Sequence, residues 1–317
     1  MSYVAWMHRG KLQRLQVGGK GAALSDLLAG GFSVPPGFCI TADAYRYFCD
    51  EAGLNERIPQ LLGEVDPAQP GSAREATERI RALIAKAPLP QELHDAIVEA
   101  YNELAAMVGL ACAVRSSAIS EDGAEASFAG LYESYLNVRG AHQVLDAVRR
   151  CYVSLWSERA VIYRAMRTHG GDEAMAVVVM GLVPSETSGV AFTAHPVTGD
   201  REQVVINASF GLGEAIVSGR VTPDSFVIAK GSFALIERGI YPKELAIYPH
   251  PDGGGTIERK LDPARQMAPS LTDEQACQVA RLAARVESHF GFPQDVEWAL
   301  SHGDLFLLQS RPITTLG

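Results

Sequence analysis

The sequence predicts an α+β protein with two lobes, a helical lobe over residues 1–185 and a sheet-rich lobe over residues 186–317. A chain of 317 residues exceeds the size of a typical single domain. In the first half apolar residues recur at helical spacing. From residue 174 they gather in short runs divided by Gly, Pro and Asp, which is typical of strands and turns.

The first lobe begins with a glycine cluster at residues 17–21, and Thr41 is a suitable N-cap further on. Pro and Gly at residues 35–37 interrupt the chain between these two points. The expected elements, in order, are a helix over 22–28, a strand over 38–40, a helix from Thr41 through Phe48, a surface connection over 55–72, helices over 73–86 and 91–107, a strand over 111–114, and a long helix over 141–167.

The second lobe is expected to be mostly strands. One segment, residues 273–290, has the spacing of a helix. The strand-like runs are 174–183, 189–193, 203–208, 225–229, 234–238, 296–300 and 305–309. No internal repeat or low-complexity tract is evident.

Bulk properties exclude several classes of protein. The net charge of -9 argues against a general nucleic-acid binder, which usually carries a basic surface. The longest apolar run, residues 174–183, is about half of what a membrane helix needs, and no signal peptide is visible. The five cysteines are scattered without a CxxC pair, so neither a zinc site nor a disulfide framework is expected. These features indicate a cytoplasmic protein that binds neither nucleic acid nor membrane.

Two cationic side chains of the first lobe could bind phosphate. Lys20 lies among three glycines, whose backbone N–H groups can approach phosphate oxygens; a tight turn followed by a surface lysine is an equal alternative. Arg115 ends a buried strand and precedes two serines, so it could clamp a phosphate bidentately. Its alternative is a structural ion pair with Glu121 or Asp122.

Two small-residue segments could also contact a ligand. Residues 127–130 (SFAG) could fold over a ligand and present backbone amides, although an ordinary Ω-loop competes. Residues 210–219 (FGLGEAIVSG) resemble a dinucleotide fingerprint at first sight. A Rossmann site needs a βαβ unit, whereas this segment lies late among antiparallel-looking strands, so that interpretation is rejected.

Three polar side chains near the C-terminus are typical of a metal and phosphate site. Glu297 and Gln309 lie on neighbouring predicted strands, and their oxygens are ligands that magnesium accepts beside phosphate oxygens. Arg311, two residues after Gln309, should point from the same face and could neutralise a transferring phosphoryl group. An edge-strand surface acid is the less favoured interpretation of Glu297. His195 and His289 are more often structural than phosphorylated in such settings.

In combination, the motifs of this chain resemble one family over essentially its whole length. The family is the ATP-binding domain of phosphoenolpyruvate synthases and pyruvate phosphate dikinases, with rifampicin phosphotransferases the most similar branch. The motifs are residues 17–21 (VGGKG), 34–38 (VPPGF), 114–118 (VRSSA), 121–122 (ED), 127–130 (SFAG), 209–214 (SFGLGE) and 309–314 (QSRPIT), and for the rifampicin branch 157–164 (SERAVIYR) and 245–248 (LAIY).

The resemblance implies an ATP-grasp fold that binds ATP and Mg²⁺ between its two lobes. Such enzymes move the β-phosphoryl group of ATP to a histidine on a separate swivelling domain and release AMP and phosphate. The histidine then passes the group to an acceptor held by a further domain, here an antibiotic of the rifampicin type. The implied roles are phosphate contacts and catalysis for Lys20, Arg115 and Arg311, nucleotide contacts for Gly130, Ser134, Tyr135 and Met180, and metal ligation for Glu297 and Gln309.

Departures from the family pattern qualify these roles. Met180 and Gly181 stand where the family usually has glutamine near the adenine. Leu131 replaces a glutamine and His195 an aspartate. The chain stops shortly after Arg311, where family members continue, so the swivelling and acceptor domains are expected in a longer protein or a separate subunit. The alternatives are the same part of a phosphoenolpyruvate synthase and a non-catalytic nucleotide-binding regulatory module.

Overall fold

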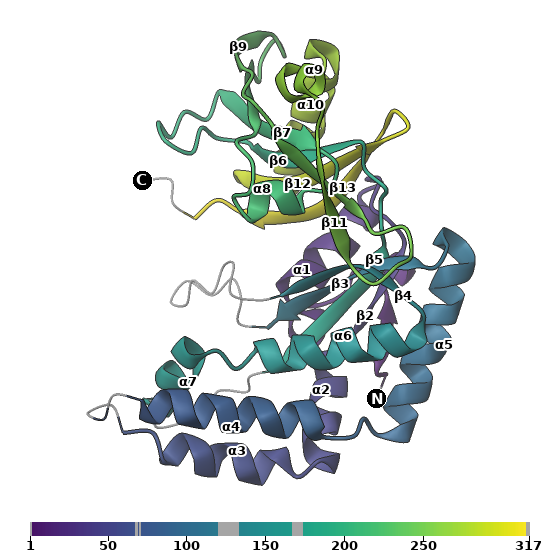
Figure 1. Ribbon diagram of the computed structural model, residues 1–317, viewed down its shortest axis with the longest axis vertical. Helices are drawn as coiled ribbons and strands as arrows, with labels where there is room; N and C mark the ends of the chain where they lie inside the picture. Colours follow the sequence, from purple (N-terminus) through teal and green to yellow (C-terminus); the bar gives the residue numbers. More distant parts are fainter. Residues whose placement is uncertain (1, 67–68, 70, 120–132, 167–173, 315–317) are drawn as a thin grey trace. The chain divides into compact units, whose positions relative to one another are not determined.

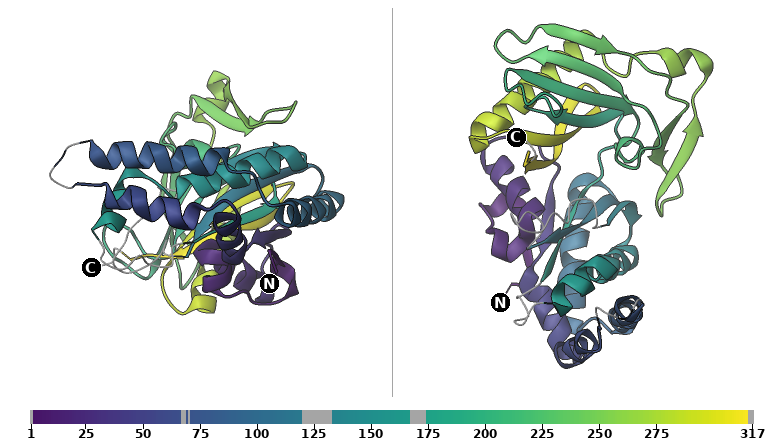
Figure 2. Two further views of the ribbon diagram at one scale, coloured as in Figure 1. Left: turned by 90° about the horizontal axis from the view of Figure 1, so that it is seen from below. Right: turned by 90° about the vertical axis from the view of Figure 1, so that its left-hand side faces the viewer.

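The computed structural model describes residues 2–66, 69, 71–119, 133–166 and 174–314. The chain forms two compact units, and each contains two stretches of sequence (Figures 1 and 2). Unit 1 comprises Met1–Ser25 and Pro36–Gly181, and unit 2 comprises Asp26–Pro35 and Leu182–Gly317. Both units combine helices with antiparallel sheet, so the molecule is of mixed α and β structure, as expected from the sequence.

Unit 1 is built on a five-stranded antiparallel sheet with the order β1-β2-β5-β3-β4. The central strand β5 is buried along all seven of its residues, which explains its continuous apolar sequence. The strands are β1 (Val4–Trp6), β2 (Gly37–Ile40), β3 (Ala111–Ala118), β4 (Ser134–Arg139) and β5 (Met175–Gly181).

Helices supply the rest of unit 1, and their apolar faces bury Phe48, Ile80, Ile97 and Tyr152 in one core with the sheet. Thr41 caps the second α-helix, because its Oγ1 accepts a hydrogen bond from the Ala44 amide. The described helices are η1 (Met7–Arg9), α1 (Arg14–Ala29, whose residues from Asp26 on belong to unit 2), α2 (Ala42–Glu51), α3 (Leu54–Gly63), α4 (Ser72–Lys86), α5 (Gln91–Val108), α6 (Ala141–Ser154) and α7 (Glu158–Ala165).

Two helical expectations were wrong in detail. The expected connection over 55–72 instead contains α3, because Leu54, Ile58 and Leu61 bury one face of it despite Pro59. The single helix expected over 141–167 is two helices. The first, α6, ends at Ser154. Ser157 then caps the start of α7, because its hydroxyl accepts a hydrogen bond of 3.2 Å from the Ala160 amide.

Unit 2 is built on a six-stranded antiparallel sheet with the order β13-β12-β6-β7-β8-β9 and a separate hairpin, β10–β11. The long helix α10 covers one face of the sheet (Figure 1). The elements are β6 (Thr187–Phe192), β7 (Gln203–Phe210), α8 (Glu214–Val217), β8 (Asp224–Ala229), β9 (Leu235–Gly239), β10 (Leu245–Pro249), β11 (Thr256–Lys260), α9 (Pro263–Met267), α10 (Asp273–Phe290), β12 (Gln294–Ser301) and β13 (Asp304–Pro312).

A buried ion pair joins the hairpin side of unit 2 to its main sheet. Asp224 on β8 and Lys243 before β10 are both fully buried, with Nζ and Oδ1 2.5 Å apart. Asp224 also accepts hydrogen bonds from the Ser270 amide and hydroxyl, both at 2.7 Å, and from the Tyr241 amide. Lys243 donates a further bond to the Tyr241 carbonyl. The charges are therefore well compensated, which buried ions require.

Residues 26–35 pack against the end of unit 2 although they come from the beginning of the chain. The Leu307 amide donates a hydrogen bond of 2.8 Å to the Ser33 carbonyl. Nε2 of His289 lies 3.0 Å from Oδ1 of Asp26. The His289 and Phe32 rings are T-shaped, with their centroids 5.5 Å apart. No described helix is long and apolar enough to cross a membrane.

Candidate nucleotide-binding site

In unit 1 the glycine cluster interrupts α1 beside strand β3. Gly18 has φ of 71° inside the helix, and a Cβ there would lie 2.1 Å from the Ser117 carbonyl oxygen. Only glycine accepts both the conformation and the approach. The expected short helix over 22–28 is therefore the later part of α1, and Lys20 lies two residues after its break.

Ser117 holds this break in place, a role that had not been predicted. Its hydroxyl donates to the Val17 carbonyl at 2.7 Å and accepts from the Gly21 amide at 3.2 Å. A serine that bonds both sides of a glycine cluster fixes the path of the backbone that carries Lys20. The sequence signal was the pair of serines after Arg115, which had been considered only as ligand donors.

The predicted nucleotide contacts of unit 1 lie on neighbouring strands. Arg115 on β3 is the cross-strand partner of Ser134 on β4, and Tyr135 pairs with Val114 next to it. Met180 on the central strand β5 is buried and pairs with Ala113. The Tyr135 hydroxyl donates to Glu133, while burial raises the Tyr135 pKa.

The thiol of Cys151 is buried on α6, the helix that packs against β3 and β4. Burial raises the pKa of Cys151 to about 12, the hydrogen bond with Ser116 lowers it, Glu133 raises it and Lys20 lowers it. The hydrogen bonds of Ser117 bring the backbone segment that carries Lys20 against β3. Next to it, the Ser116 hydroxyl donates to the Glu133 carbonyl just before β4.

In unit 2, strands β12 and β13 place four polar side chains on one face. Glu297 is the direct partner of Gln309, and Asp295 is the partner of Arg311. Residues two apart on a strand share a face, so all four project together. The strands are joined by His302 and Gly303, both with positive φ, which suits a two-residue hairpin turn. The adjacency of Glu297, Gln309 and Arg311 expected from the sequence is present.

Asp295 fixes the orientation of Arg311. Both Nε and Nη2 of Arg311 lie 2.8 Å from Oδ2 of Asp295. The Oδ1 atom of Asp295 is buried and has no hydrogen-bond partner among the described residues. Burial raises the pKa of this carboxyl, Arg311 lowers it and Glu297 raises it. Asp295 belonged to the polar group that suggested a metal-bound polyphosphate, but no individual role had been predicted for it, although its two-residue spacing from Glu297 repeats that of Gln309 and Arg311.

The chemistry of this face suits a hard divalent cation. Two carboxylates and an amide supply oxygen ligands, and the Oδ1 atom of Asp295 is a buried acceptor without a hydrogen-bond partner among the described residues. The described residues contain no cluster of three or more His, Cys, Asp or Glu.

The glycine-rich segment at residues 210–219 follows an antiparallel strand, so the rejection of a Rossmann site is confirmed. Gly211 has φ of 76°, and a Cβ there would lie 2.3 Å from the Ile247 carbonyl oxygen. The Leu212 amide donates to the same oxygen at 2.8 Å. The hydroxyls of Ser185 and Ser188 both donate to the Gly211 carbonyl. The segment is therefore bound tightly to strand β10.

The two histidines considered above have structural partners. Nδ1 of His195 accepts hydrogen bonds of 3.2 Å from the amides of Val197 and Thr198, which stabilises the turn after β6. His289 pairs with Asp26. The predicted contact Gly130, the departure Leu131, the segment 127–130 and the acids Glu121 and Asp122 lie outside the described residues.

One known protein family matches nearly the whole chain. Residues 14–317 match the family described as "Pyruvate phosphate dikinase, AMP/ATP-binding domain". A phosphoenolpyruvate synthase of Pyrococcus furiosus is 41% identical over an alignment that covers 95% of this chain and 42% of that protein.

A rifampicin phosphotransferase of a Streptomyces species is 43% identical, with 95% of this chain and 34% of that protein covered. A probable phosphoenolpyruvate synthase of Methanocaldococcus jannaschii is 39% identical and is covered over 27% of its length. The chain thus spans less than half of the relatives that it matches. On the strength of the family match over residues 14–317 and of these identities, the chain belongs to the pyruvate phosphate dikinase AMP/ATP-binding domain family.

Proposed function

We propose that this chain is the ATP-binding part of a dikinase-type phosphotransferase and that it has the ATP-grasp fold, in which two lobes, here residues 1–185 and 186–317, bind one nucleotide. The observation that carries the proposal is the polar face of β12 and β13, where Asp295, Glu297, Gln309 and Arg311 project together. An apolar-packed strand pair has no structural need for such a group, whereas a polyphosphate site does.

Each half of the proposed site has a distinct task. Lys20 and Arg115 bind phosphate oxygens, Lys20 as a compact charge and Arg115 as a planar fork. Arg311, held by Asp295, contacts the phosphoryl group during its transfer and offsets the charge that develops in the transition state. Gly130, Ser134, Tyr135 and Met180 line the nucleoside. Because Met180 is apolar, it packs on the base and leaves hydrogen bonding to backbone groups.

Glu297 and Gln309 are the proposed ligands of Mg²⁺. The bound ion neutralises phosphate charge and aligns the polyphosphate for displacement. The Oδ1 atom of Asp295, which has no hydrogen-bond partner among the described residues, would face the same ion directly or through a water molecule. We expect the chain's own residues to bind ATP weakly and without a fixed geometry when the cation is withheld.

The proposed reaction moves the β-phosphoryl group of ATP to a histidine of a separate swivelling domain, with AMP and phosphate as products. This histidine domain and the domain that binds the final acceptor are partners in a longer protein or a separate subunit. The proposed place of the reaction is the cytoplasm. The proposed acceptor is an antibiotic of the rifampicin type, supported by the 43% identity to a rifampicin phosphotransferase. Pyruvate is the alternative, supported by the 41% identity to a phosphoenolpyruvate synthase.

The proposal is tested by incubating the chain with ATP, Mg²⁺ and a separately produced histidine domain from a relative. We expect AMP to form only when all three are present, with the label of [β-³²P]ATP on the histidine domain. Glu297→Gln should abolish transfer while the fold is retained. Nucleotide binding with no AMP under any of these conditions would instead support the regulatory module.

The kind of acceptor is inferred from the histidine domain that the chain prefers. Histidine domains from a rifampicin phosphotransferase and from a phosphoenolpyruvate synthase are supplied in parallel. Because the acceptor binds outside this chain, the informative readout is which of the two histidine domains this chain charges faster. Equal rates would leave the first step intact and would remove the preference for the antibiotic.

A further inference from the structure

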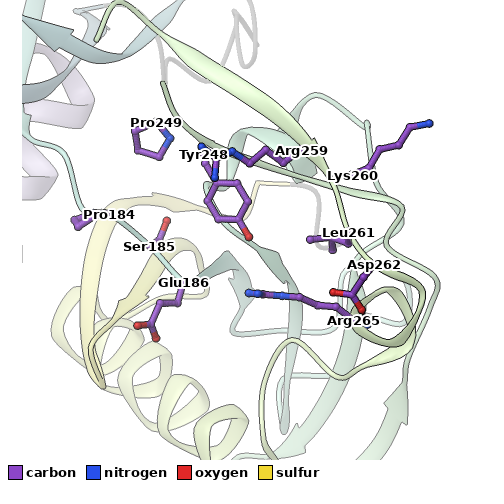
Figure 3. A pocket seen from close by; sticks show the side chains of 10 residues that line it. All are labelled: Pro184, Ser185, Glu186, Tyr248, Pro249, Arg259, Lys260, Leu261, Asp262 and Arg265. Carbon is purple, nitrogen blue, oxygen red and sulfur yellow. Dashed lines mark hydrogen bonds between the residues drawn. The ribbon is translucent and has the colours of Figure 1, made fainter. Parts of the chain in front are cut away.

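Unit 2 contains a cavity of about 520 Å³ that is not lined by any residue of the polar face of β12 and β13. It lies between the β10–β11 hairpin and α9 on one side and the segment that enters β6 on the other (Figure 3). Its size is within the range of small-molecule sites. Ten residues line it, and none is among those proposed to bind ATP: Pro184, Ser185, Glu186, Tyr248, Pro249, Arg259, Lys260, Leu261, Asp262 and Arg265.

Two hydrogen-bond donors point into the middle of this cavity. The guanidinium group of Arg265 reaches in from α9, and the Tyr248 hydroxyl reaches in from β10 (Figure 3). Arg259 lies beside Tyr248, whereas the Lys260 side chain is directed outward (Figure 3). A guanidinium fork together with a phenol hydroxyl is a donor set that matches the oxygens of an anion.

Stacking holds both arginines without using up their N–H groups. The Arg265 Cζ atom lies 4.8 Å from the centroid of the Phe210 ring, and the Arg259 Cζ atom lies 5.8 Å from that of Tyr248. A stacked guanidinium keeps its edge free for hydrogen bonds. The short helix that carries Arg265 is itself fixed, because Asp262 caps it through the Arg265 amide.

The positive charge of the cavity is not cancelled by the acids that line it. Within the part of the chain that the structure describes, neither Arg259 nor Arg265 has a carboxylate within 4.0 Å. Asp262 is engaged as the cap of α9. Glu186 lies 3.7 Å from Nδ1 of His302 and points away from the middle of the cavity (Figure 3).

We propose that this cavity binds the phosphate group of a small phosphorylated molecule, with Arg265 and Arg259 neutralising the phosphate and the Tyr248 hydroxyl donating to it. Phosphate is favoured over a carboxylate because two guanidinium groups match a dianion. Two residues that line the cavity also contact the glycine-rich segment at residues 210–219. Arg265 stacks on Phe210, and Ser185 bonds the Gly211 carbonyl.

The test uses the whole chain in a Lys20→Gln/Arg311→Gln background, which removes two proposed phosphate contacts of the ATP site. Inorganic phosphate is titrated and binding is followed by calorimetry and by ³¹P line broadening. We expect saturable binding that weakens about tenfold or more in Arg265→Gln, since a hydrogen bond to a charged group is lost. Tyr248→Phe keeps the ring and should weaken binding a few-fold.

Arg281→Gln is the matched control. Arg281 also stacks on an aromatic ring of unit 2, with its Cζ atom 5.2 Å from the Phe233 centroid, but it does not line the cavity. Its binding should equal that of the background. The proposal would be overturned if the background bound no phosphate saturably. It would also be overturned if the Arg265→Gln and Tyr248→Phe variants bound phosphate as tightly as the background does. Should Arg265→Gln unfold, Tyr248→Phe and Arg259→Gln decide alone. Neither outcome bears on AMP formation.

Discussion

Replacing Lys243 by methionine isolates the contribution of one buried ion pair to the stability of unit 2. Methionine has a similar length and fills the same space, but it leaves Asp224 charged at a position with no exposed surface. Removing one partner of a buried pair typically costs about 3–5 kcal/mol, because the remaining charge is uncompensated. The Lys243 ammonium also lies 5.6 Å from the centroid of the Phe210 ring, and because the ammonium is buried the loss of this contact adds about 1–2 kcal/mol.

The loss should be visible as a lowered unfolding temperature. For domains of 150–250 residues each kcal/mol shifts the midpoint by about 2–4 °C, so the variant should melt about 10 °C lower. Differential scanning calorimetry measures the shift, and urea unfolding gives the free energy independently. Asp224→Asn/Lys243→Met removes both charges and should regain part of the loss.

Lys230→Met is the matched comparison. Lys230 and Glu287 are also 2.5 Å apart, but their side chains are 15% and 20% exposed, so water screens the charge that remains and the loss should be clearly smaller. The reasoning fails if Lys243→Met costs less than about 1 kcal/mol, or if the double variant is as unstable as the single one.

Three further changes have defined outcomes. Asp295→Asn should lower AMP formation on the order of 100-fold by releasing Arg311, while the melting temperature stays equal or rises because a carboxyl whose pKa is raised by burial is removed; full activity would exclude the positioning role. Gly18→Ala should cost about 1–3 kcal/mol, because the residue has φ of 71° and a Cβ would meet the facing strand; a neutral effect in urea unfolding would contradict this. Unfolding free energy should fall above pH 9, since burial raises the pKa of Cys39 and Cys151 from 9.0 to about 12 and only the unfolded chain then loses these protons; stability that rises from pH 9 to 11 would refute it.

The sequence predicted the elements that have a strong local signal. The spacing of Glu297, Gln309 and Arg311 was enough to predict neighbouring strands with a shared face, because side chains alternate along any strand. The helix at 273–290 was predictable from its spacing and agrees with α10 (Asp273–Phe290). The same reasoning failed for α3, because the prediction gave the several Pro and Gly residues of 55–72 more weight than the apolar residues that bury one face of this helix.

Contacts between distant segments could not be read from the sequence. Ser117 binds Val17 and Gly21 across about a hundred residues, and nothing local distinguishes such a serine from a ligand donor. The Asp295–Arg311 contact depends on the register of the hairpin and on an irregularity between Glu297 and Trp298, which only the folded strands define. The cavity beside Arg265 is likewise formed by two parts of the chain that are distant in sequence, residues 184–186 and residues 248–265.

The early residues that complete unit 2 constrain how this protein can be made. Residues 26–35 are synthesised before most of unit 1, yet His289, the partner of Asp26, is made 263 residues later, and Leu307, the partner of Ser33, is made later still. During vectorial synthesis unit 1 can close over its own core first, whereas residues 26–35 must wait until the later strands and helix of unit 2 have been made. An expressed fragment that starts at Leu182 would therefore lack part of its own unit, and a dissection of this protein should carry residues 26–35 along, for instance through a circular permutation.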